Sequence, residues 1–333
     1  MKKFTGYKKG VNLGGWLSQC KHSVAHYDAF ITERDIEQIS AWGLDHVRLP
    51  VDYECVRSDD GQYLESGFEI IGKCIDWCEK YGLNVVLDLH KTPGFSFDAE
   101  KNALFGNPEF EGIFLWLWEE FSFRFGRRKN IAFELLNEVI DENSEHWNRL
   151  SAMAINVIRN NAPDIPIILG GAQWNSVHTL KLLEKPDDGN IVYNFHFYEP
   201  FLFTHQNASW HPLMVGVHID YPADIEEYRN LSKELKCFGS GLYNTDTMGA
   251  EFIEALIKEA VEAAEASNVP LYCGEYGVID CADAKQTLEW YKDINSVFEK
   301  YGIGRAAWTY KGMNFGLIGE HYGSVITQII GLL

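Results

Sequence analysis

Two stretches of the sequence decide the predicted fold: FELLNE at residues 133–138 and LYCGEYG at residues 271–277. Each is a short apolar run, typical of a buried strand, with a glutamate near its far end: Glu138 in the first and Glu275 in the second. A buried carboxylate is costly unless it is paired or takes part in chemistry. The two glutamates lie far apart in the sequence, but a barrel of parallel strands would bring both to one rim.

Working outward from these stretches, apolar runs alternate with longer amphipathic segments along the whole chain. The runs predicted to be strands are 10–13, 46–50, 84–90, 131–138, 165–171, 191–198, 270–278 and 304–311. The segments predicted to be helices are 33–42, 68–81, 109–125, 145–160, 176–183, 250–266, 284–301 and 324–332. Eight strand–helix units predict an α/β fold in which a parallel sheet closes into a (β/α)8 TIM barrel.

The alternative to a barrel is an open, doubly wound sheet. Such a sheet commonly binds a dinucleotide through a G-x-G-x-x-G turn after its first strand, but the chain has Gly14-Gly15-Trp16 there and contains no Walker motif. The barrel is therefore favoured, and residues 1–333 are expected to form a single catalytic barrel. The segment from about 200 to 249 is too long for an ordinary connection, and we predict an insertion packed over the rim that carries the site.

Composition excludes several classes of protein. The chain has 29 basic and 48 acidic residues, a net charge of −19, which argues against nucleic acid and anionic membranes as partners. Seven cysteines without regular spacing predict neither a disulfide framework nor a metal site. Ten tryptophans and sixteen tyrosines either fill a core or line a groove whose flat faces suit sugar rings. The sequence contains no run of about 18 apolar residues, so no membrane-spanning helix is predicted.

Polar and aromatic residues gather where the predicted strands end, which in a barrel is where functional side chains lie. These residues are Arg48, His90, Asn137, Glu138, His196, Tyr198, Glu275 and Trp308. Because side chains alternate along a strand, His196 and Tyr198 share one face. Glu134 shares the parity of Glu138, and its expected role is structural: to neutralise Arg48 or accept hydrogen bonds below the site. A lone buried histidine is usually a core residue, whereas several polar groups on one rim predict a site.

With these eight residues in order at their strand ends, the chain resembles glycoside hydrolase family 5. The resemblance runs from Asn12-Leu13-Gly14-Gly15-Trp16 to Ala307-Trp308-Thr309-Tyr310 and is greatest to clostridial-type endoglucanases that lack attached binding modules and carry an insertion after strand six. Lys91, Val139 and Glu199 depart from residues that many relatives carry beside the site. These departures leave the predicted chemistry intact and leave the substrate preference open.

The resemblance implies a retaining mechanism with Glu275 as the nucleophile and Glu138 as the general acid and base. Arg48 and Tyr198 would keep Glu275 ionised, and His196 would tune Glu138. The residues expected to bind substrate are His90, Asn137 and Trp308, with Trp16, Trp174, Phe203 and Trp210 as candidate outer platforms. A carboxyl separation of about 5–5.5 Å would fit this mechanism, and one near 8 Å would exclude it.

The expected substrate is a β-1,4-glucan, either soluble or amorphous cellulose, or mixed-linkage β-1,3-1,4-glucan. Mannan, glucomannan or another β-glycoside is the alternative, as is a carbohydrate-binding barrel that has lost catalysis. An aldolase or metal hydrolase would need a Schiff-base lysine or a ligand cluster, and Lys91 and Lys311 do not interrupt the constellation. No cofactor or metal is implied, and we expect a monomer. No signal peptide is recognised, which favours the cytoplasm, while a polysaccharide substrate favours the exterior.

Overall fold

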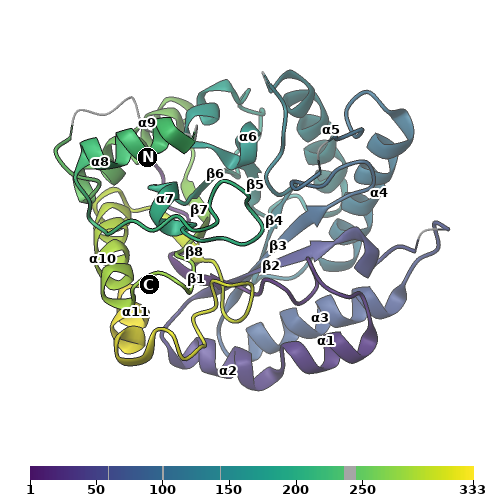
Figure 1. The fold of residues 1–333 in the computed structure, drawn as a ribbon. Coiled ribbons are helices and arrows are strands. Elements are labelled where there is room, and N and C mark those ends of the chain that lie inside the picture. Colours follow the sequence, from purple (N-terminus) through teal and green to yellow (C-terminus); the bar gives the residue numbers. More distant parts are fainter. Residues whose placement is uncertain (59, 100, 143, 236–244) are drawn as a thin grey trace.

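The strand-forming runs close into one parallel barrel (Figure 1). The computed structural model describes residues 1–58, 60–99, 101–142, 144–235 and 245–333. The strands are β1 (Lys9–Asn12), β2 (His46–Asp52), β3 (Asn84–Lys91), β4 (Ile131–Glu134), β5 (Ile167–Gly170), β6 (Ile191–Phe197), β7 (Leu271–Tyr276) and β8 (Gly304–Ala307). Each pairs with the next, and β8 pairs with β1, so the predicted TIM barrel is confirmed and the open sheet is excluded.

Helices surround the barrel and cover the outer faces of its strands (Figure 1). They are α1 (Val24–Phe30), α2 (Glu33–Ala41), α3 (Glu65–Lys80), α4 (Pro108–Phe125), α5 (Glu145–Asn161), α6 (Ala172–Asn175), α7 (Phe201–Thr204), α8 (Ile225–Leu235), α9 (Ala250–Ser267), α10 (Ala284–Tyr301) and α11 (Ile326–Leu332). Short 3-10 turns are η1 (Tyr53–Cys55), η2 (Val177–Leu182) and η3 (Gly323–Val325). Local sequence sets these limits: the Asp283 side chain caps the first turn of α10, and Gly302 ends it with φ 68°.

The interior of the barrel has an apolar floor and a polar upper layer. The floor consists of Val86, Ala132, Ile168, Val192, Tyr272 and Ala306, with Phe4 and Tyr7 packed against them. Two residues further along β3, β4 and β6, the inward-facing positions carry Asp88, Glu134 and Asn194, all fully buried. Because alternation sends every second side chain inward, the carboxyl end of the barrel collects these polar groups.

β4 and β8 end well before the predicted limits of their runs, and four helices were not expected. β4 ends at Glu134 and β8 at Ala307, so Glu138 and Trp308 lie on the connections that follow. The unpredicted helices are the four-residue α6 and α7, the seven-residue α1, and α8, whose first turn is acidic. The predicted runs are longer than the strands because the connecting segments are also apolar and buried. Apolar content therefore does not mark where a strand ends.

The long segment after β6 begins at the active-site end of the barrel. Its first helix, α7, contacts the connection after β7 through a hydrogen bond from Ile279 N to Thr204 O of 2.9 Å. Its second helix, α8, lies beside α9, where the Tyr228 and Phe252 rings are 5.9 Å apart (Figure 1). Residues 236–244, which belong to the predicted insertion, lie outside the described residues.

Across the described ranges, no helix combines the length and apolar character needed to cross a membrane.

Candidate active site

Arg48 of β2 is the centre of the polar layer, and its fully buried guanidinium contacts five carboxylate or amide groups around the barrel. Its Nε and Nη2 donate to the two oxygens of Glu134 at 2.7 and 2.9 Å. Its Nη1 donates to Glu275 Oε1 at 2.7 Å, and its Nη2 also donates to Asn137 and approaches Asp88 at 3.0 Å. The planar guanidinium therefore fixes the direction of several strand-end side chains at once.

The Glu275 carboxylate reaches the interior because β7 is irregular at this point. Tyr272 faces inward, so strict alternation would turn Glu275 toward the helices. The register of β7 shifts against both neighbours, between Phe195 and His196 on β6 and between Cys273 and Tyr276 on β7 itself. Such bulges redirect a side chain, and here the shift turns Glu275 inward, where it contacts Arg48.

The residue before the nucleophile candidate has to be small. A Cβ on Gly274 would lie 2.8 Å from Asn194 Nδ2 and 3.0 Å from His196 Nε2. Asn194 spans the gap between two elements of the site: it accepts a hydrogen bond from Gly274 N and donates one to Glu134 Oε1, both of 2.8 Å. Glycine at this position therefore lets β6 and β7 approach closely beside Glu275.

Glu138 approaches Glu275 from the opposite side of the barrel mouth. It lies four residues beyond the end of β4 and has φ 46°, in the left-handed region that side chains rarely adopt. A carboxylate oxygen of Glu138, one of Glu275 and a ring nitrogen of His196 all lie within 4.8 Å of one another. This close approach fits the roughly 5–5.5 Å separation of the carboxyl groups in retaining glycosidases better than the roughly 6.5–9.5 Å of inverting ones.

His196 lies between the two glutamates. Its Nδ1 is 2.9 Å from Glu138 Oε1 and 3.6 Å from Glu275 Oε2, and its Nε2 is 3.1 Å from the Asn175 amide. Burial, together with the positive charge of Arg48, lowers the pKa of His196 well below its usual range. The imidazole is therefore neutral and takes part in hydrogen bonds without adding a charge.

The environments of the two glutamates differ in a way that separates their roles. Burial and the neighbouring Glu275 carboxylate raise the pKa of Glu138 well above its usual range. Burial raises the pKa of Glu275 as well, but Arg48 opposes that shift, as does the Tyr198 hydroxyl, which donates to Glu275 Oε2 at 2.9 Å. Glu275 therefore ionises first, and Glu138 keeps its proton.

Glu134 is a third carboxyl group that shares the positive charge of Arg48. Burial raises the pKa of Glu134 to about 7, with the Asp88 carboxylate adding to the shift and Arg48 opposing it. The expectation that Glu134 contacts Arg48 is confirmed by their paired hydrogen bonds. One guanidinium faces three carboxylates, so a proton on one of them lowers the electrostatic cost of burying the group.

His90 and Trp308 form the wall on the β3 and β8 side. Their rings are parallel, with centroids 6.0 Å apart, and His90 Nδ1 is 2.7 Å from Asp88 Oδ2. Burial alone would lower the pKa of His90, but the Asp88 carboxylate outweighs it and raises that pKa. Trp308 can lie here because Gly14 has no side chain: a Cβ there would be 2.7 Å from the indole.

The four candidate outer platforms divide into two pairs. Trp174 and Trp210 are about half exposed, at 48% and 51%. Trp16 and Phe203 are fully buried, Trp16 with its Nε1 donating to Tyr27 O and Phe203 with its ring against Tyr221. The prediction of a sugar platform was therefore wrong for Trp16 and Phe203, because neither ring offers a face to a ligand.

Two residues of the site were not singled out from the sequence. Asn12 at the end of β1 donates to Gly274 O at 2.9 Å and accepts from Arg48 at 3.0 Å, so it joins β1 to the site. Its place at a strand end, just before Gly14-Gly15-Trp16, was an available signal. Asn175 has no such signal, because it follows Gln173 and Trp174 in a left-handed stretch that brings its amide to His196.

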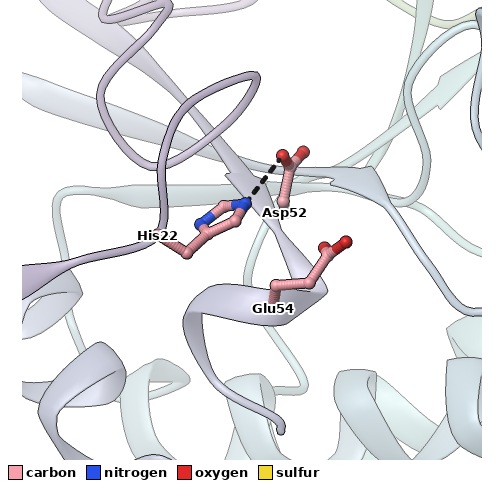
Figure 2. A group of neighbouring side chains, drawn as sticks. All are labelled: His22, Asp52 and Glu54. Carbon is pink, nitrogen blue, oxygen red and sulfur yellow. Dashed lines mark ion pairs between the residues drawn. The ribbon is translucent and has the colours of Figure 1, made fainter. Parts of the chain in front are cut away.

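A second polar cluster lies on the rim beside β2, formed by His22, Asp52 and Glu54 (Figure 2). His22 Nε2 is 3.3 Å from Asp52 Oδ2, and its Nδ1 is 2.8 Å from the Tyr27 hydroxyl. Glu54 is ion-paired with Lys91. The donor atoms would suit a cation, but a lysine already neutralises Glu54 and hydrogen bonds occupy both nitrogens of His22. The donor atoms of Glu138, His196 and Glu275 are also close enough to suit a cation, but Glu275 is already paired with Arg48.

A parallel barrel with two carboxylates this close together at its carboxyl end, one of them ion-paired with an arginine, is typical of a glycoside hydrolase of the retaining type. The comparisons with known proteins then place the chain in one family: it belongs to the cellulase family, glycosyl hydrolase family 5, whose model matches residues 6–314.

Three similar proteins illustrate the relationship. Cellodextrinase A of Ruminococcus flavefaciens is 44% identical over 92% of this chain and 86% of its own length. Endoglucanase C of Acetivibrio thermocellus is 40% identical over 98% of both chains. The crystal structure of the clostridial cellulose synthase subunit Z from Clostridioides difficile superposes with a TM-score of 0.79 at 26% identity, covering 98% of this chain and 99% of that one.

Proposed function

We propose that the protein is an endo-acting β-1,4-glucanase that cleaves cellulose-type chains by double displacement, with retention of the anomeric configuration. The observation that carries the mechanism is the spacing of Glu138 and Glu275, whose carboxylate oxygens approach within 4.8 Å. The linkage is supported by the names of the relatives, a cellodextrinase and an endoglucanase at 44% and 40% identity.

In the first step, the ionised Glu275 attacks the anomeric carbon while Glu138 donates its proton to the leaving glycosidic oxygen. The bond to the leaving sugar breaks as the ester bond to Glu275 forms. The negative charge of Glu275 is thereby lost, and one of the causes that raise the pKa of Glu138 is removed. Glu138 can then act as a base.

In the second step, Glu138 accepts a proton from a water molecule, whose oxygen attacks the anomeric carbon and displaces Glu275. The product sugar leaves with its original configuration, and Glu138 is protonated again. The Tyr198 hydroxyl and Arg48 receive the carboxylate as its charge returns, because both donate to it at 2.9 and 2.7 Å. No step requires a metal ion or a cofactor.

The residues around the carboxylates would bind the sugar at the cleavage point. Asn137 accepts from Arg48 through Oδ1, and among the described residues its Nδ2 donates to no protein group, so it would donate to the sugar 2-hydroxyl, a contact that can strengthen in the transition state. His90 would bind hydroxyls of the same ring, and Trp308 would lie beneath it. The half-exposed Trp174 and Trp210 are the remaining candidates for platforms that bind sugars further along the chain.

We also propose that the whole chain acts as one catalytic unit in which the segment from about 200 to 249 covers part of the rim. The support comes from its first part. His205 packs edge-on against Tyr198 with ring centroids 5.0 Å apart, and Trp210 lies 6.3 Å from Phe315. A segment that contacts the donor to the nucleophile can shape the groove on that side.

The test is the release of reducing sugar from carboxymethyl cellulose, barley β-glucan, glucomannan and xylan by the parent and by Glu275→Gln. Cleavage of the first two by the parent alone supports the proposal and its nucleophile, and a rapid fall in viscosity supports endo action. Preferential cleavage of glucomannan keeps the mechanism and overturns the linkage. A parent that binds β-glucan without cutting it would be a carbohydrate-binding barrel, and an active Glu275→Gln would overturn the assignment of the nucleophile.

A further inference from the structure

A cavity of about 310 Å³ lies outside the polar layer, between the loop that follows β2 and the first half of α4. We call it the loop–α4 pocket. Its loop side is formed by Arg57, Gly61 and Tyr63, and its helix side by Glu109, Gly112, Ile113 and Trp116. The volume is at the lower end of the roughly 300–1,000 Å³ typical of small-molecule sites, and the pocket is open to solvent.

The pocket contains an aromatic corner. The rings of Tyr63 and Trp116 are 4.8 Å apart and inclined at 63°, and Trp116 Nε1 donates to the Tyr63 hydroxyl at 3.0 Å. This hydrogen bond fixes the two rings relative to each other. Tyr63 is 51% exposed, so its ring is held in place without being buried by the protein itself. A fixed, exposed ring with a polar tip offers both apolar contact and a hydrogen bond to a ligand.

The charged residues of the pocket balance each other. Arg57 contributes a cation from the loop, and Glu109 contributes a carboxylate from the first turn of α4. Within the described part of the chain, neither side chain takes part in a hydrogen bond or an ion pair. A pocket with donors, acceptors and no net charge favours a neutral, polyhydroxylated ligand over an anion, a nucleic acid or a metal ion.

Gly112 lines the pocket at a position where the helix itself would favour a side chain. Glycine inside a helix costs about 1 kcal/mol relative to alanine. No atom lies within 4 Å of the place where its Cβ would stand, so close packing does not demand glycine here. The missing side chain instead keeps the pocket open between Tyr63 and the helix.

We propose that the loop–α4 pocket is a second saccharide-binding site, which binds a β-glucan chain away from the catalytic carboxylates. The inference rests on the proposed function for the identity of the sugar. Both segments that form the pocket follow the carboxyl ends of strands, β2 and β3, so the pocket lies toward the same end of the barrel as Glu138 and Glu275. A polymer bound there is kept at high local concentration near the catalytic site, whereas a short oligosaccharide that occupies the pocket alone gains no such advantage.

Two variants test the pocket without touching the polar layer. Gly112→Gln fills the pocket, and Tyr63→Ala removes the exposed ring. The control is Gly331→Gln, because Gly331 is also an exposed helical glycine with no atom within 4 Å of its Cβ position. We expect both pocket variants to raise KM for barley β-glucan about fivefold, with kcat/KM for cellotetraose unchanged, and the control to match the parent on both substrates.

A direct binding measurement separates this inference from the proposed function. The parent and the variants are run in native gels with and without hydroxyethyl cellulose, a neutral soluble glucan derivative. Retardation of the parent that is reduced in Gly112→Gln and Tyr63→Ala supports the pocket, even if the parent cleaves no glucan. Equal retardation of all four proteins, no retardation of any, or an equal loss of activity on polymer and cellotetraose overturns it.

Discussion

His196 Nδ1 lies 2.9 Å from Glu138 Oε1, and this neutral imidazole connects the proposed general acid to the Asn175 amide on its other side. The protonation of Glu138 therefore depends on Asn175, which acts through His196. An uncharged His196 leaves the pKa of Glu138 high, because it offers a hydrogen bond without a compensating positive charge.

Changing Asn175 to Asp places a carboxylate about where the amide now lies, 3.1 Å from His196 Nε2. The new charge raises the pKa of His196, and a more cationic His196 stabilises ionised Glu138. We expect the basic limb of the kcat/KM profile to move to lower pH. Asn175→Leu, which removes the partner without adding charge, lowers kcat/KM but leaves this limb in place. Identical limbs in the two variants would contradict the connection.

Glu138→Ala is expected to separate substrates by their leaving groups. Loss of a general acid lowers the rate about 10²- to 10⁴-fold for β-glucan, whose leaving oxygen needs a proton. A 2,4-dinitrophenyl cellobioside needs none, so its burst of dinitrophenol is retained, and added azide speeds turnover by replacing water as the attacking group. The exposed Glu142 on the following loop provides the control, Glu142→Ala. An equal loss on both substrates would argue against the acid role.

Arg48→Met is expected to destabilise the fold as well as abolish activity. Removing the guanidinium leaves Asp88, Glu134 and Glu275 buried without a cation, which costs about 3–5 kcal/mol at neutral pH. The loss shrinks as pH falls, because the three carboxylates become protonated. Urea unfolding at pH 7 and pH 5 measures both effects. The surface control, Arg128→Met, loses only exposed ion pairs and is expected to cost less than about 1 kcal/mol.

The His22–Asp52 pair predicts a loss of stability at alkaline pH. Burial alone would lower the pKa of His22, but hydrogen bonding to Asp52 outweighs it and raises that pKa from 6.5 to about 9. A raised histidine pKa gives stability that is complete below the unfolded value of 6.5 and is lost as pH rises through 9. We expect the Tm of the parent to fall between about pH 7 and 9.5 more steeply than that of His22→Asn. A parallel decline in both, with the exposed His218→Asn as reference, would refute the assignment.

The sequence predicts the barrel well because strand alternation and helical periodicity are local properties. All eight predicted runs contain a strand, and the eight predicted site residues lie at the carboxyl end of the barrel. The expected contact between Glu134 and Arg48 is also present. Arg48, His90 and Glu134 lie on regular strands, so their place follows from spacing alone.

The remaining features depend on irregular backbone or on burial, which spacing does not encode. Glu275 faces inward only because β7 shifts its register, and Asn175 reaches His196 only through a left-handed segment. Trp16 and Phe203 show that burial is equally hard to predict. In the sequence, an aromatic residue near a strand end looks the same whether it fills the core or lines a groove. Tertiary packing decides between the two.

The left-handed backbone of Glu138 implies that thermal stability and activity make opposing demands on this residue. A residue with a Cβ costs about 1–2 kcal/mol in this conformation, and glycine adopts it freely. Glu138→Gly also removes a largely buried carboxyl group whose ionisation Glu275 opposes. An inactive Glu138→Gly protein that melts at a higher temperature than the parent would show that selection for turnover has kept this enzyme less heat-resistant than its fold allows.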